Sequence, residues 1–443
     1  MPRPTPWFLV GTLSTIICSS LAGCDSEPGI RSTPPDDPAV NDPAFTVRAL
    51  ENWYLVGDGL TADESMMTIV VDAPAGTKFV DAWIGSLAPV RLDETETPGT
   101  FGVQLSIADL PAKSHAVLLA ADGAATAFAK VPFERSYPYY VMVSTDWDFA
   151  DPGKLAIAYQ DSLHELHPGM RLTHFVGPYT FTDPVITPAR RSELVTWLLA
   201  QETEFSDEIG LHIHPYCNFV TTAGLTCITD QSTVYANDDS GYTVKLGAYG
   251  RTDFGTLLDR AHELFAQAGL PRPRTFRAGG WTATLETVQA LNDKGYVADT
   301  SALNWATIEE WDGEGNGELY RWNMANWAPI NATSQPYRPR ETNVLEPGAP
   351  GLAIVEVPDN GTMIDYVSVA EMTAIFDANF TGTALAKPTT LMMGFHPAPG
   401  FSEPEFLRVD GFLKYADMHL ATRDLGPVVY TTLADVSTVF ATP

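Results

Sequence analysis

The strongest constraint on the fold of this 443-residue chain is a repeated alternation of strand-like and helix-like segments after residue 137. Short apolar runs typical of buried strands are followed by stretches whose apolar residues recur at helical spacing. Parallel strands need long crossover connections, usually helices, so this order predicts a parallel sheet covered by helices. We therefore expect residues 137–443 to form an α/β domain whose parallel sheet is closed or nearly closed into a barrel. The expected strands are residues 140–145, 171–176, 208–213, 275–278, 295–298, 353–357, 390–395 and 427–430, and the expected helices are residues 154–166, 189–204, 254–268, 285–294, 369–379 and 403–422.

Residues 44–136 have a different pattern. Short apolar runs recur about every ten residues, with Gly, Asp and Pro between them and no long amphipathic helix. This spacing predicts a small β-sandwich, which we expect to be immunoglobulin-like. The segment contains no catalytic cluster, so a spacer or packing role is favoured over carbohydrate binding.

The first 43 residues predict an export signal and a tether. Arg3 precedes an apolar stretch, residues 7–21, that is too short for a typical membrane span. The Leu-Ala-Gly-Cys sequence that ends at Cys24 is similar to a bacterial lipobox, so we expect residues 1–23 to be a signal peptide and Cys24 to carry a lipid. The alternative is an ordinary signal peptide with an incidental cysteine. Residues 24–43 are polar and rich in proline, which predicts a semi-extended tether to a bacterial cell membrane, outside the cytoplasm.

The cysteines agree with export. Once Cys18 is removed and Cys24 is acylated, Cys217 and Cys227 remain, and in an oxidising compartment we expect them to form a disulfide. Closing so short a loop would stabilise the fold by roughly 2–3 kcal/mol. The alternative makes Cys217 a metal ligand, because it lies three residues after His214.

The formal net charge of −29 limits the class of partner. Such an acidic protein repels phosphate backbones, so nucleic-acid binding is not expected. A neutral or cationic glycan is favoured over a polyanionic substrate for the same reason.

Two pairs of side chains with metal-binding chemistry close two of the expected strands. Residues i and i+2 of a strand point to the same face, and the carboxyl ends of parallel strands share one edge of the sheet. Carboxylate and imidazole together form a ligand set for Zn²⁺ or a similar divalent ion. The two pairs, and two further residues at the ends of other expected strands, are Asp146 with Asp148, His212 with His214, Arg277, and His396.

Four short motifs contain these residues in order along the chain. They are Asp146-Trp147-Asp148, residues 208–214, residues 277–281, and Gly394-Phe395-His396-Pro397. Over residues 138–440 they resemble the polysaccharide deacetylase family, the NodB-type carbohydrate esterases, which implies a deformed barrel of that type. The common family pattern has adjacent aspartates and histidines four apart, whereas both pairs here are two apart. The fourth family motif has only weak candidates, in residues 299–301 and 355–359.

The resemblance implies a role for each residue. Asp146 would be the catalytic base, Arg277 would position it, and His396 would be the catalytic acid. A divalent metal ion, expected to be Zn²⁺, would polarise the acetyl carbonyl and lower the pKa of a bound water. The metal-ligand candidates are Asp148, His212 and His214, and the substrate-binding candidates are Trp281 and Tyr216.

These features predict a lipid-anchored, metal-dependent deacetylase of an N-acetylated glycan. An O-acetyl polysaccharide esterase uses the same chemistry and remains an alternative, as does an inactive glycan-binding lipoprotein. The aspartates could instead cap loops, and Arg277 could be an ordinary ion-pair partner. The other histidines have no matching partners in the sequence and are expected to be structural or solvated: His164, His167, His174, His262 and His419.

Overall fold

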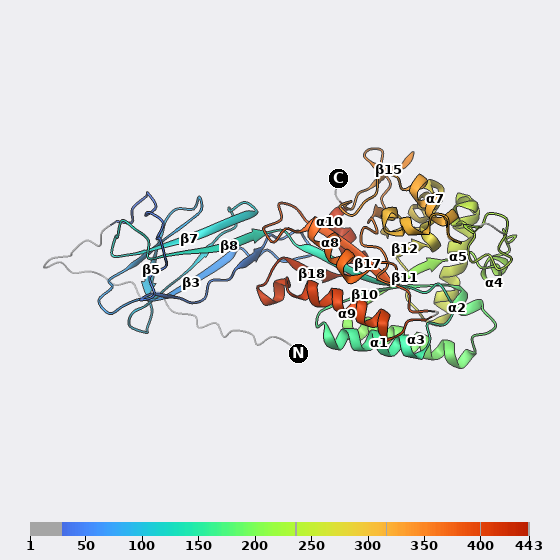
Figure 1. Ribbon diagram of the computed structural model, residues 1–443, viewed down its shortest axis with the longest axis horizontal. Coiled ribbons are helices and arrows are strands. Elements are labelled where there is room, and N and C mark those ends of the chain that lie inside the picture. Colours follow the sequence, from blue (N-terminus) through green and yellow to red (C-terminus); the bar gives the residue numbers. More distant parts are fainter. Residues whose placement is uncertain (1–28, 235–236, 316, 399, 442–443) are drawn as a thin grey trace, which may run out of the picture.

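The computed structural model describes residues 29–234, 237–315, 317–398 and 400–441. A β-rich part at one end of the molecule joins an α/β part at the other, and the chain passes between them once near residue 137 (Figure 1). None of the helices in these ranges is long and apolar enough to cross a membrane. The expected signal peptide and Cys24 lie outside the described residues, so the lipid anchor stays a prediction.

The β-rich part contains eight strands in the order β1-β3-β6-β5-β4-β7-β8-β2, all pairs antiparallel except β2 with β8. β5 pairs with both β4 and β6 and links the two groups of strands around one apolar core. The expected apolar runs lie within strands, whereas an immunoglobulin-like topology stays a prediction. The strands are β1 Thr46–Val47, β2 Trp53–Leu55, β3 Met66–Asp72, β4 Val80–Ile84, β5 Val90–Glu94, β6 Thr100–Ser106, β7 Lys113–Ala121 and β8 Ala129–Ser136.

The α/β part is built on a curled parallel sheet in the order β16-β13-β12-β11-β10-β9-β17, with β18 beside the first half of β9. The two outer strands, β16 and β17, do not pair directly, so the expected barrel is open within the described residues. The segment before residue 365 runs along β17 in this gap, where Met363 bridges Gly394. The strands are β9 Tyr139–Asp146, β10 Leu172–Val176, β11 Glu208–Ile213, β12 Thr275–Ala278, β13 Ala298–Asp299, β16 Val355–Glu356, β17 Thr389–Phe395 and β18 Val428–Thr431.

Helices cover the sheet, and the longer ones lie close to their predicted positions because their apolar stripes are regular. Figure 1 shows α1, α3 and α9 along one flank of the α/β part. The Thr187 side chain caps α3, which begins with Pro188, and Ser368 forms a capping box with Glu371 at the start of α8. The helices are α1 Lys154–Leu166, α2 Tyr179–Thr182, α3 Pro188–Phe205, α4 Cys217–Val220, α5 Arg251–Ala268, α6 Leu285–Asp293, α7 Gly317–Asn326, α8 Val369–Asn379, α9 Glu403–Asp417 and α10 Leu433–Phe440.

Residues 300–350 are more ordered than their sequence suggests. The sequence of this region predicts loops that could form a lid or rim over the site. The structure has a 3-10 helix, Trp305–Trp311, then α7, then a hairpin of β14 Pro339–Arg340 and β15 Asn343–Pro347. These elements are short and are separated by Gly and polar residues, so no apolar periodicity in the sequence predicts them.

The two parts of the chain are joined by specific polar contacts. The Asp424 carboxylate accepts hydrogen bonds from the main-chain amides of Asn52 and Trp53. The Tyr140 hydroxyl, from β9, donates to the Asp58 carboxylate at 2.7 Å. These contacts fix the β-rich part against the end of the α/β part where β9 and β18 begin, opposite the strand ends that carry the motifs.

A buried pair of carboxyl groups lies between β13 and β16, where the register places Asp299 beside Glu356. Both side chains are fully buried and hydrogen-bond to each other. Burial raises the pKa of the Asp299 carboxyl to about 6, and burial together with the Asp299 charge raises the pKa of Glu356 well above its usual value. The pair therefore holds a proton at mildly acidic pH.

This pair makes stability depend on pH. Carboxyl groups whose pKa is raised on folding contribute stability below their unfolded pKa, and that contribution is lost as the pH rises through the folded pKa. Glu356→Gln removes one of the two charges. The melting temperature of the variant should therefore fall less than that of the wild type between pH 5 and pH 8. At pH 8 the loss in the free energy of unfolding should be smaller in the variant by roughly 2 kcal/mol. Calorimetry at several pH values measures this, with the exposed Glu202→Gln as control. Parallel pH curves for all three proteins would contradict it.

Candidate metal centre

The candidate residues meet because their strands are neighbours in the sheet. His212 of β11 lies beside Arg277 of β12, and Phe395 at the end of β17 lies beside Thr145 of β9. Asp146 ends β9, and His396 directly follows β17. The shared edge of a parallel sheet thus brings together residues that are up to 250 positions apart in the chain.

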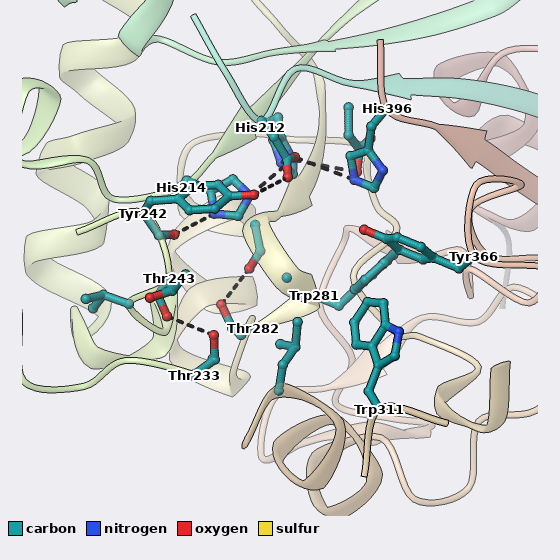
Figure 2. Close-up of a pocket in the computed structure, with 16 residues that line it drawn as sticks. His212, His214, Thr233, Tyr242, Thr243, Trp281, Thr282, Trp311, Tyr366 and His396 are labelled. Atoms are coloured by element: carbon teal, nitrogen blue, oxygen red, sulfur yellow. Dashed lines mark hydrogen bonds and ion pairs between the residues drawn. The ribbon is translucent and has the colours of Figure 1, made fainter. Parts of the chain in front are cut away.

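Asp148 is the centre of the cluster. Its Oδ1 atom lies 3.0 Å from His212 Nε2, 3.3 Å from His214 Nε2 and 3.7 Å from His396 Nε2. Its Oδ2 atom accepts a hydrogen bond of 2.7 Å from the hydroxyl of Tyr242. Figure 2 shows His212 and His396 at the top of the cavity, and His214 and Tyr242 at its left.

The tautomers of two of these histidines are fixed from behind. His212 Nδ1 donates to the Arg277 carbonyl at 3.0 Å, and His214 Nδ1 donates to the Tyr242 carbonyl at 2.7 Å. With the proton on Nδ1, each neutral imidazole turns an Nε2 lone pair toward the Asp148 carboxylate. His214 Nε2 is buried and has no hydrogen-bond partner in the part of the chain that the structure describes. Electron pairs facing one another in this way fit a cation between them, with the orienting carbonyls typical of metal-ligating histidines.

The distances agree with this fit. Two ligands of a tetrahedral Zn²⁺, each about 2.0–2.1 Å from the ion, lie about 3.3 Å apart. Asp148, His212 and His214 place one ligand atom each within 4.8 Å of one another. The group of Asp146, Asp148 and His396 meets the same limit, but Asp146 is already paired with an arginine and His396 with a second carboxylate.

Asp146 is held by Arg277. Arg277 Nη1 donates to Asp146 Oδ1 at 2.9 Å and to the Ser144 hydroxyl at 2.8 Å, and its Nη2 lies 3.4 Å from Asp359 Oδ2. Arg277 is fully buried and packs on the ring of Phe175. The guanidinium therefore lies between two buried carboxylates and holds Asp146 in one orientation.

His396 is held by Asp365. Its Nδ1 donates to Asp365 Oδ2 at 2.7 Å, while Nε2 faces the cavity and Asp148. Burial alone would lower the pKa of this imidazole, but the charges of Asp365 and Asp148 outweigh it and raise the pKa to about 10. The imidazole is therefore protonated at neutral pH, and its Nε2–H is available as a proton donor.

A cavity of about 100 Å³ opens directly below these residues. Trp281 lies in its wall, with the indole Nε1 donating to Asp359 Oδ2 at 2.8 Å. Tyr366 and Trp311 lie on the same side as Trp281 (Figure 2), with the Tyr366 ring centroid 6.3 Å from that of Trp281 and 4.8 Å from that of Trp311. Leu319 also lines the cavity. Tyr216 is absent from the lining among the described residues, and its hydroxyl donates to the Asp148 carbonyl at 3.1 Å.

The packing around the site explains two of its glycines. A Cβ atom on Gly279 would lie 2.6 Å from the imidazole of His214, so this position of the third motif must be glycine for the ring to fit. Gly241 has φ of +81°, and a Cβ there would lie 2.4 Å from the Pro215 carbonyl. Both glycines therefore allow the main chain to approach His214 closely.

The predictions for the two cysteines and for three of the other histidines agree with the structure. Cys217 and Cys227 form the expected disulfide, so Cys217 is not a metal ligand. Three of the other histidines are buried against carboxylates and are structural. Asp207 accepts from both His164 and His174, and His167 lies between Asp410 and Asp417.

Sequence reasoning missed three residues of the site. Asp365 and Tyr242 lie in segments without strand or helix periodicity, and Asp359 belonged to a weak candidate for the fourth motif. Burial raises the pKa of the Tyr242 hydroxyl, and the Asp148 charge raises it further, so this phenol stays a donor. The only signal in the sequence was the position of Asp359 just after an apolar run.

Comparisons with known proteins give distant similarities. No family model matches the chain, and no curated protein matches it. Polysaccharide deacetylases and family 4 carbohydrate esterases are among the similar solved structures, and they belong to the family that the motifs resemble. The similar region covers about two thirds of this chain.

Three of these structures are as follows. A protein from Mycobacterium smegmatis assigned as a polysaccharide deacetylase is 13% identical over 68% of this chain and 89% of its own, with a TM-score of 0.39. A family 4 carbohydrate esterase from Streptomyces lividans in complex with acetate is 10% identical over 68% and 94%, with a TM-score of 0.33. A Parabacteroides distasonis protein assigned as a glycoside hydrolase/deacetylase is 9% identical over 69% and 72%, with a TM-score of 0.43. With similarities this low, the function has to be argued from the site itself.

The ligand set can be tested by its metal content. His214→Ala removes one candidate ligand and should lower the divalent metal bound per protein to a small fraction of the wild-type value, because two remaining ligands hold a metal ion weakly. Elemental analysis after dialysis against trace Zn²⁺ measures this. His115→Ala in the β-rich part is the control, since the ring of His115 stacks on Phe133 and its Nε2 contacts the Pro111 carbonyl, neither of which belongs to the site. Equal metal content in all three proteins would remove His214 from the ligand set.

Proposed function

We propose that this protein is a metal-dependent hydrolase that removes acetyl groups from an N-acetylated glycan. The observation that carries the proposal is the convergence of His212 and His214 on one oxygen of Asp148, beside the separately held pair of Asp146 and His396. Hydrolysis of an amide needs an activated water, a polarised carbonyl and a proton for the leaving group. The cluster offers a group for each of these needs.

Asp148, His212 and His214 would hold the divalent ion, which we propose to be Zn²⁺. When bound there, the ion supplies charge that polarises the acetyl carbonyl and lowers the pKa of a water molecule. Among the described residues, the Nδ1 partners of both histidines are carbonyl oxygens, so each ring keeps the tautomer that this role requires.

Asp146 would act as the base. Its Oδ1 is bound by Arg277, which leaves Oδ2 to take a proton from the attacking water. Arg277 also holds the carboxylate in one orientation, since it is itself clamped between Asp146 and Asp359. Ser144 accepts from the same guanidinium nitrogen and completes this support.

His396 would act as the acid. Its protonated Nε2 faces the cavity and would donate to the departing nitrogen as the bond to the acetyl carbon breaks. Asp365 holds the other ring nitrogen and stabilises the imidazolium before the transfer. After the transfer, the ring is a neutral base and can recover a proton from solvent.

The glycan assignment rests on the motif resemblance and on the aromatic wall of the cavity. Trp281, Trp311 and Tyr366 offer faces on which a sugar ring can pack. The acidic surface of the protein suits a glycan that gains amino groups as it is deacetylated. Removal of O-acetyl groups would use the same residues, so the substrate has to be decided by assay.

The proposed location is outside the cytoplasm, on a lipid anchor at Cys24. The disulfide between Cys217 and Cys227 supports an oxidising compartment. Metabolic labelling with a radioactive fatty acid, with Cys24→Ser as the unlabelled control, tests the anchor directly.

The catalytic proposal is tested by Asp146→Asn, which keeps the shape of the side chain and removes its basicity. We expect activity on acetylated chitooligomers to fall about 100-fold to 10,000-fold, while the bound metal stays at the wild-type level because Asp146 is not a ligand. Activity is measured as amine released, and metal by elemental analysis. Acetyl-xylan is assayed in parallel.

Two results would contradict the proposal. Release of acetate from acetyl-xylan without amine formation from chitooligomers would make the protein an esterase. Equal inactivity of the wild type and Asp146→Asn on a broad panel of acetylated glycans would favour a glycan-binding protein without turnover.

A further inference from the structure

Tyr242 contacts two of the three candidate ligands at once. Its hydroxyl donates to Asp148 Oδ2 at 2.7 Å, and its main-chain carbonyl accepts from His214 Nδ1 at 2.7 Å. The ring also packs on the His214 imidazole, with 4.4 Å between centroids. In Figure 2, Tyr242 lies over His214 on the side of the cavity away from His396.

We propose that Tyr242 is a positioning residue of the metal centre, which fixes Asp148 as a ligand through Oδ1 alone and His214 as a ligand through Nε2. This inference rests on the proposed metal-dependent hydrolase. The residue itself contacts neither the cavity end occupied by His396 nor the proposed base.

The need for such a residue follows from the end of β11. The strand ends at Ile213, so His214 lies beyond the residues that the hydrogen bonds of the sheet hold in place. His214 therefore takes its orientation from what packs around it, namely Gly279 on one side and Tyr242 on the other. Without Tyr242, no group in the described part of the chain accepts a hydrogen bond from His214 Nδ1.

The segment that carries Tyr242 is itself anchored next to His214. The amide of Cys217 donates to the Ser240 carbonyl at 2.8 Å, and Gly241 fits against the Pro215 carbonyl. The Asp238 carboxylate accepts from the amides of Ser240 and Thr243, on both sides of Tyr242. The disulfide closes the start of the same segment. These contacts hold the main chain at Tyr242 while its side chain reaches Asp148.

The contact at Oδ2 also bears on the choice of metal. A carboxylate whose second oxygen is held by a phenol binds a metal through one oxygen, which suits the low coordination number of Zn²⁺ or Co²⁺. Mn²⁺ prefers more oxygen ligands. Tyr242 thus favours Zn²⁺ over Mn²⁺ at this site.

The test is Tyr242→Phe, which removes the hydroxyl and keeps the ring and the main-chain carbonyl. We expect Zn²⁺ to bind the metal-free variant about 10-fold to 100-fold more weakly, with a smaller change for Mn²⁺. Competition with a chromophoric chelator measures the Zn²⁺ and Mn²⁺ affinities. The visible spectrum of the Co²⁺-loaded variant should also differ from that of the wild type, because the Asp148 carboxylate is no longer restrained. Circular dichroism confirms that the variant is folded.

The matched control is Tyr249→Phe, from the same segment. The Tyr249 hydroxyl accepts from the Ile228 amide at 3.0 Å and does not touch a candidate ligand. Unchanged Zn²⁺ affinity and Co²⁺ spectrum in Tyr242→Phe would overturn the proposal, and so would equal losses in the two variants, since these would indicate a role in the segment alone.

These outcomes are separate from those for the proposed function. A wild type that binds Zn²⁺ but hydrolyses no acetylated glycan refutes the function and leaves the affinity comparison in force. If the wild type hydrolyses glycans and Tyr242→Phe binds Zn²⁺ as tightly as the wild type does, only the role of Tyr242 is refuted.

Discussion

The site depends on one oxygen atom, Asp148 Oδ1, which three imidazole nitrogens approach within 3.0 to 3.7 Å. Burial alone would raise the pKa of the Asp148 carboxyl, but the neighbouring histidines, and the charge of His396 foremost, hold the pKa well below its usual range. A buried carboxylate needs compensating positive charge. A divalent cation between Asp148, His212 and His214 would provide that charge, and the carbonyls behind the two rings prepare them for it.

A second buried charge, the Arg277 guanidinium, separates the tasks of the two aspartates. It occupies Oδ1 of Asp146 and is balanced by Asp359 behind it, so one oxygen of Asp146 is already engaged, while Oδ2 lies 4.0 Å from His212 Nδ1. Asp365 does the same for His396. The five groups therefore fall into a ligand set and a proton-transfer pair because each member of the pair has its own counter-charge, a division that the sequence spacing does not reveal.

Much of the fold could be predicted from the sequence, because strands buried on both faces are continuous apolar runs and the long helices have regular stripes. The bounds of β11 and β12 agree with the expected ones, and the residues at their ends lie in the site. The openness of the sheet could not be predicted, since it depends on how residues 361–364 lie along β17. The same irregular segment carries Asp365 to His396, and a polar loop carries Tyr242 to Asp148. Tertiary contacts place both residues, and no local pattern marks them.

The two-residue spacing of the histidines follows from where β11 ends. His212 is still within the strand and is oriented by the neighbouring strand, through the Arg277 carbonyl. His214 lies beyond the last ladder position, so its ring must be oriented by a segment from elsewhere, and residues 237–250 lie close enough to do so through the Tyr242 carbonyl. A disulfide three residues after His214 and a glycine with positive φ before Tyr242 restrict the paths that this segment can take. The short spacing and the cross-linked segment are thus parts of one solution, in which a ligand at a strand end gains its orientation from the chain that follows it.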